Sequence, residues 1–167
     1  TKIMRGNQFI CFLPQLPNNK EEKEVDEDDK LVVSRESFTQ KNVKGFLLFC
    51  VCVLGYVVKP CHARWAMHVV GRWLNGEKKS MVLAPRDHGK STILTVAYVI
   101  WRIILNPDIR VLIVSNSADA AKKFLAAISS HFEKNDVLRK MFGDYVGKSK
   151  WNDSEIIVSK RVAFGFK

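Results

Sequence analysis

The sequence has little that would mark a disulfide-stabilised, metal-binding or membrane-spanning protein. It contains four cysteines among 167 residues, and the spacing of Cys11, Cys50, Cys52 and Cys61 fits neither a disulfide framework nor a usual zinc pattern. The apolar neighbours of Cys50 and Cys52 predict buried free thiols, and a reducing compartment follows from that. The apolar stretch 45–58 has 14 residues, whereas a membrane-spanning helix needs about 20. We therefore expect no association with a membrane.

Acidic residues are scarce outside one short run. Seven of the 17 Asp and Glu residues lie in EEKEVDEDD, residues 21–29, so residues 30–167 hold 10 acidic residues against 23 basic ones. The run predicts a disordered linker, and we expect residues 1–36 to form a tail. The basic surplus favours a polyanionic partner such as nucleic acid or nucleotide, although a solvated basic surface has the same composition.

Two helices are expected to precede the main folded part. The first includes residues 46–54, which are almost entirely apolar, and ends at Gly55. The second begins at Pro60, because proline is tolerated in a first helical turn, and ends at Asn75 and Gly76. These helices define a helical segment at residues 37–76.

The remainder, residues 77–167, alternates short apolar runs with helical patterns. Helices are expected over residues 91–105 and after Ser117, a plausible N-cap. The runs expected to be strands are SMVLA (80–84), IRVLIV (109–114) and EIIV (155–158), and VAFGF (162–166) could pair with the last. Strands alternating with helices predict an α/β fold, with a parallel sheet flanked by helices.

The stretch MVLAPRDHGKST, residues 81–92, runs from an apolar segment through a tight loop into a helix. This order predicts a phosphate-binding loop, in which backbone N–H groups and the helix N-terminus contact the phosphate oxygens. Gly89 would let the backbone approach the phosphate without a Cβ. Lys90 would reach the β- and γ-phosphates, and Ser91 would ligate Mg²⁺.

The match to the usual pattern G-x-x-x-x-G-K-[ST] is imperfect, because Ala84 takes the place of the first glycine. The same tripeptide recurs at residues 147–149, but that copy follows no apolar run and leads into no helix. An ordinary strand-to-helix turn is the alternative interpretation of residues 84–91.

Arg86 is the unusual residue of this loop. It could stabilise charge on a γ-phosphate, as arginine fingers do, or it could be a surface arginine paired with Asp87 or Asp153.

The segment LAPRDHGKST resembles the Walker A segment of viral terminase large subunits, the ATPase motors that package DNA. That family favours P-R-x-x-G-K-[ST], so the departure at Ala84 agrees with it. The segments FCVCVLGYVVKPCHARW, NPDIRVLIVSNSADAAKKF and KSKWNDSEIIVSKR resemble the family's segments before and after the loop. The resemblance covers about residues 44–161.

The resemblance implies a partial RecA-like P-loop NTPase domain that binds ATP and Mg²⁺. It assigns catalytic roles to Arg86 and Lys90, a metal-ligating role to Ser91, and a helix-capping role to Thr92. His62 and Trp65 would lie where related motors approach the adenine, although Trp65 fits core packing as well. The residues expected to contact ATP are Pro85, Arg86, Asp87, His88, Gly89, Lys90, Ser91 and Thr92.

The resemblance also implies the partners. These are ATP, double-stranded DNA, a portal protein, a terminase small subunit and further copies of the same chain, assembled in the host cytoplasm. Related motors need an apolar strand ending in Asp-Glu, and no such run follows Ser91. We therefore expect an N-terminal part of a longer ATPase, inactive in hydrolysis alone. A helicase-like ATPase and a non-catalytic basic DNA-binding module are the alternatives.

Overall fold

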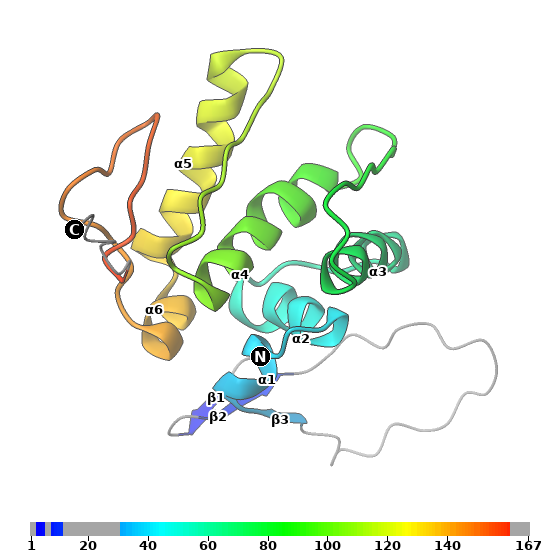
Figure 1. The fold of residues 1–167 in the computed structure, drawn as a ribbon. Helices are drawn as coiled ribbons and strands as arrows, with labels where there is room; N and C mark the ends of the chain where they lie inside the picture. Colours follow the sequence, from blue (N-terminus) through cyan, green and yellow to red (C-terminus); the bar gives the residue numbers. More distant parts are fainter. Residues whose placement is uncertain (1–2, 6–7, 12–30, 161–167) are drawn as a thin grey trace. The chain divides into compact units, whose positions relative to one another are not determined.

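A computed structural model describes residues 3–5, 8–11 and 31–160 (Figure 1). The chain divides into two compact units, Thr1–Val82 and Leu83–Lys167, and each is described separately below. The acidic run and its predicted disorder lie outside the described residues.

The first unit begins with a small antiparallel sheet. Its strands are β1 (Ile3–Arg5), β2 (Gln8–Cys11) and β3 (Leu31–Val33), in the order β1-β2-β3. Ile3 pairs with Ile10, and Phe9 pairs with Val33.

Helices follow the sheet within residues 34–74 of the first unit. They are α1 (Arg35–Thr39), α2 (Val43–Leu48), a π-helical continuation η1 (Phe49–Val53), and α3 (Pro60–Leu74). The side chain of Asn42 caps α2 by accepting a hydrogen bond from the Gly45 amide at 2.6 Å. The first turn of α3 is closed by the Lys59 amide, which donates to His62 Nδ1 at 3.1 Å. Both predicted helices are thereby confirmed.

Phenylalanine side chains and thiols form the core of this unit. Phe38, Phe46 and Phe49 are fully buried, as is Cys50, and Cys52 is almost so. Both cysteines are free thiols, as predicted. Burial raises the pKa of the Cys50 thiol far above its ordinary value, because the apolar surroundings disfavour the thiolate. These two thiols therefore pack as small apolar side chains.

The described part of the second unit, residues 83–160, is built on three helices. The helix that follows the loop begins at Lys90 and continues through η2 (Thr92–Ala97) and α4 (Tyr98–Leu105). It is followed by α5 (Ala118–Lys134) and α6 (Asp136–Phe142). Ser117 caps α5 as predicted, its hydroxyl accepting from the Ala120 amide at 3.2 Å. The buried side chains include Ile93, Ile100, Trp101, Ile128, Phe132 and Leu138.

The predicted parallel sheet, and with it the P-loop NTPase fold, is wrong for this structure. Residues 80–84 and 109–114 belong to no strand, and no ladder hydrogen bonds join them to a neighbour within residues 31–160. Their side chains are exposed to match: Leu83 by 87%, Leu112 by 86% and Val114 by 80%. The run 155–158 contributes one isolated antiparallel bridge, Trp151 with Ile156. The expected pairing of residues 162–166 lies outside the described residues.

The physical reason is that β-branched composition favours extended backbone locally, whereas a strand also needs a neighbour to satisfy its N–H and C=O groups. Figure 1 shows the chain between α4 and α5 running beside α5 as an open segment. No helix in the described part of the chain combines the length and the apolar character needed to cross a membrane.

Candidate phosphate-binding site

The loop of residues 84–89 leads directly into the apolar helix that continues as α4, as Figure 1 shows. Two of its residues have left-handed backbone: Asp87 with φ of 63° and Gly89 with φ of 71°. Gly89 adopts this conformation without strain because it has no Cβ, whereas Asp87 does so at some cost. The loop is thus sharply turned where the sequence predicts close approach to a phosphate.

The turn borders an open hollow of about 500 Å³, which is lined by the consecutive residues Ala84 to Thr92. The structure therefore brings all eight predicted contact residues, Pro85 to Thr92, around one cavity. This volume falls within the range of small-ligand sites, roughly 300–1,000 Å³.

Four backbone amides around this hollow have no hydrogen-bond acceptor among the described residues. The first helical hydrogen bond runs from the Ile93 amide to the Gly89 carbonyl at 3.0 Å. The amides of Asp87, Gly89, Lys90 and Ser91 donate no hydrogen bond to any other described residue. Unsatisfied N–H groups at the start of a helix carry partial positive charge and favour an anion.

Two cations accompany these amides. Lys90 is half-buried at the start of the helix, and Arg86 is exposed in the loop. Neither forms an ion pair within the described residues. Pairing of Arg86 with Asp153 is not observed, because Lys122 Nζ lies 2.7 Å from Asp153 Oδ2 instead. The charge near the loop is therefore uncompensated except by the neighbouring Asp87 carboxylate.

The two hydroxyls that follow Lys90 differ in exposure. Ser91 is half-buried and forms no side-chain capping bond, and Thr92 is exposed. The predicted capping of the helix by Thr92 is not seen, since its hydroxyl bonds to no described residue. No group of three or more His, Cys, Asp or Glu side chains in the described ranges could hold a metal ion. Only the Ser91 hydroxyl offers a ligand at the predicted position.

The His88 side chain forms a hydrogen bond to the backbone of its own loop. Its Nδ1 lies 2.7 Å from the backbone carbonyl oxygen of Arg86, spanning Asp87. The sequence analysis places His88 among the contact residues but does not predict this hydrogen bond. The one feature that could have suggested it is a histidine inside a segment expected to be a tight loop.

The second Gly-Lys-Ser, residues 147–149, lies in an antiparallel turn. The Ile157 amide donates to the Lys150 carbonyl at 2.8 Å, and the Ser159 amide donates to the Tyr145 carbonyl at 3.0 Å. A Cβ added to Gly147 would fall 1.7 Å from the Ile157 carbonyl oxygen. This glycine therefore provides space for chain packing, and no helix follows it up to residue 160, where the described part ends.

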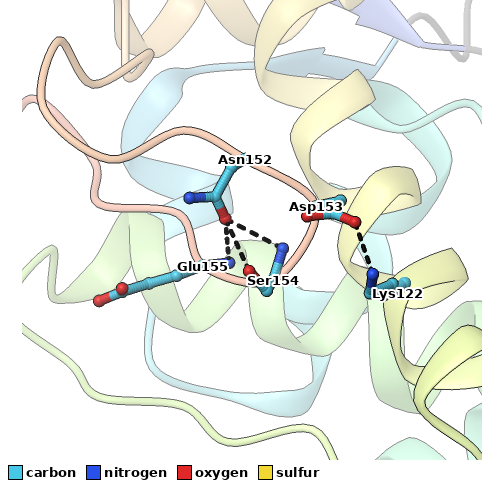
Figure 2. Close-up of polar contacts among 5 residues, drawn as sticks. All are labelled: Lys122, Asn152, Asp153, Ser154 and Glu155. Atoms are coloured by element: carbon cyan, nitrogen blue, oxygen red, sulfur yellow. Dashed lines mark hydrogen bonds and ion pairs between the residues drawn. The ribbon is translucent and has the colours of Figure 1, made fainter.

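Side chains attach this turn (residues 144–159, hereafter the hairpin) to α5. Lys122 of α5 reaches Asp153, and Figure 2 shows the pair beside the hairpin tip. At the tip, the Asn152 side-chain oxygen accepts hydrogen bonds from Ser154 and Glu155, drawn in the same figure. The hairpin is thus a packed structural element.

His62 and Trp65, the residues expected near adenine, lie on α3 in the first unit. His62 is buried, its ring centroid is 5.3 Å from that of Trp65, and its Nδ1 accepts the Lys59 amide. These contacts give His62 a structural role in starting α3, and the adenine contact stays a prediction.

Comparisons with known protein families, with curated proteins and with solved structures found no match to this chain. The candidate site consists of an open loop whose amides, two cations and one hydroxyl line a single hollow.

Proposed function

We propose that the loop Ala84–Thr92 binds the phosphates of ATP, and that the chain is the nucleotide-binding part of an ATPase motor resembling the terminase large subunit. The observation that carries the proposal is that one hollow is lined by amides and by two cations that have no partner among the described residues. A polyphosphate is the ligand that would satisfy both, because its oxygens accept from amides and attract Lys90 and Arg86.

In this proposal each side chain has a distinct task. Lys90 supplies a point charge to the terminal phosphates, and Arg86 a planar guanidinium able to bind two oxygens at once. Gly89 keeps the backbone free of a Cβ at the closest approach. Double-stranded DNA as the motor's partner agrees with the basic surplus of the sequence.

The residues around the hollow offer a magnesium ion one protein ligand, the Ser91 hydroxyl. Mg²⁺ keeps several waters and is commonly held by phosphate oxygens with few protein ligands. Ser91, half-buried at the start of the helix, would supply that protein ligand. The ion would neutralise charge on the phosphates, while Lys90, Arg86 and the loop amides orient them.

The second Gly-Lys-Ser provides a matched control for the test. Binding of a fluorescent ATP analogue is measured with and without magnesium for the parent chain, Lys90→Ala and Lys148→Ala. We expect Lys90→Ala to weaken binding about 10- to 100-fold, the scale of a charge-assisted hydrogen bond, and Lys148→Ala to leave it unchanged. Equal affinities in the parent chain and Lys90→Ala, or no binding by either, would overturn the proposal.

A further inference from the structure

We infer that His88 is a positioning residue of the phosphate-binding loop. It would act as a clasp, holding the backbone around Asp87 in the shape that leaves the loop amides pointing to the ligand. The inference rests on the proposed function and concerns how the same site is kept in its binding shape.

The geometry of the clasp is specific. Nδ1 of His88 lies 2.7 Å from the Arg86 carbonyl oxygen, and a carbonyl only accepts, so Nδ1 must carry the proton. The bond spans Asp87, whose φ of 63° is unusual for a residue with a side chain. Such a conformation persists where neighbouring contacts hold it, and this hydrogen bond is such a contact.

The hydrogen bond also gives the Arg86 carbonyl oxygen a donor within the loop. His88 is exposed, so packing in the core does not fix the position of its ring. The bond also survives protonation of the ring, because both nitrogens of an imidazolium carry hydrogen.

The first test measures affinity for the fluorescent ATP analogue in His88→Ala and His88→Asn. Loss of one hydrogen bond should weaken binding about three- to tenfold in His88→Ala. His88→Asn should recover most of the affinity, because its amide nitrogen can donate to the same carbonyl. An unchanged affinity in His88→Ala, or no recovery in His88→Asn, would overturn the clasp.

A second pair of variants tests the link to Asp87. Asp87→Gly removes the cost of the left-handed backbone, so the clasp should matter less in its presence. We expect His88→Ala to change affinity less than about twofold in the Asp87→Gly background, a coupling that a double-mutant cycle measures. Fully additive effects would contradict the inference.

A spectroscopic readout requires no nucleotide. The ¹⁵N shifts of the His88 ring in the full chain report which nitrogen is protonated, and the clasp requires Nδ1–H. A neutral ring protonated only at Nε2 would overturn the clasp.

The Lys90→Ala variant distinguishes failure of the clasp from failure of the proposed nucleotide binding. If it weakens binding while His88→Ala does not, the clasp is wrong and the proposed function stands. If the parent chain binds no nucleotide, the proposed function is wrong, and the role of His88 toward phosphate is wrong with it.

Discussion

Residues 89–91 and residues 147–149 both read Gly-Lys-Ser, and the structure places them in different surroundings. Gly89 has φ of 71° and ends an open loop at the start of a helix. Gly147 does not need a positive φ, and it lies against the Ile157 carbonyl inside the hairpin. The glycine therefore has a different structural role in each copy. Gly89 is needed for a left-handed backbone conformation, and Gly147 is needed because a Cβ would not fit.

This difference predicts where the free-energy cost of a substitution will be observed. A packed position cannot relax, so a misfit there lowers the stability of the folded chain. An open loop can relax while it is empty, so a misfit there lowers the affinity for a ligand that needs the original shape.

The largest expected effect is on stability, from Gly147→Ala. The added Cβ would lie 1.7 Å from a backbone oxygen, so the hairpin must open or shift. We expect a loss of about 1–3 kcal/mol, the usual range for overpacking, measured by chemical denaturation. Gly71→Ala is the matched control, because a Cβ on that helical glycine meets nothing within 4 Å. It should be neutral or slightly stabilising. Equal stabilities of the two variants would remove the distinction between the copies.

A smaller effect, on affinity, is expected from Gly89→Ala. An alanine in left-handed backbone costs about 1–2 kcal/mol, which corresponds to roughly a five- to thirtyfold weaker binding of the ATP analogue. Because the empty loop can relax, its thermal unfolding midpoint should stay close to that of the parent chain. Gly89→Asn should lose less affinity, since asparagine tolerates this conformation better. If Gly89→Ala lowers the stability of the fold and leaves the affinity unchanged, Gly89 has a packing role like that of Gly147, and the expected difference between the copies is wrong.

The prediction that the two Gly-Lys-Ser copies differ came from the segments around them and not from the tripeptide itself. The apolar helix after Gly89 is present, and the Ser117 cap is formed. Residues 150–160, which follow the second copy, also contain no helix, as predicted. Helix ends are readable because capping and turn residues act over a few neighbouring positions.

The prediction of a sheet was wrong because it depended on contacts between residues far apart in the sequence. A strand depends on partners distant in sequence, and the composition of residues 109–114 does not specify one. The His88 clasp escaped prediction because it depends on the exact turn at Asp87, which an aspartate only weakly favours. Local rules therefore predicted the helices correctly, whereas the long-range pairing could not be derived from them.

The smallest expected effect concerns the ion pair that attaches the hairpin to α5. The hydrogen bond and charge of Lys122 lower the pKa of the Asp153 carboxyl below its ordinary value of 3.8. A lowered folded-state pKa stabilises the fold above the unfolded pKa, and the contribution is lost as the pH falls through the folded one. The unfolding midpoint of Asp153→Asn should therefore lie slightly below that of the parent chain at pH 7, and the gap should close below about pH 4.

Both side chains are exposed, so salt should also narrow this gap. Lys123→Met, which removes a neighbouring exposed charge of α5, is the control and should show no such dependence on pH. The affinity of Asp153→Asn for the ATP analogue completes the comparison. It should equal that of the parent chain, because Asp153 pairs with Lys122 and leaves Arg86 to the loop. A change in affinity would mean that the hairpin and the phosphate-binding loop are coupled, and the two Gly-Lys-Ser copies would then not act independently.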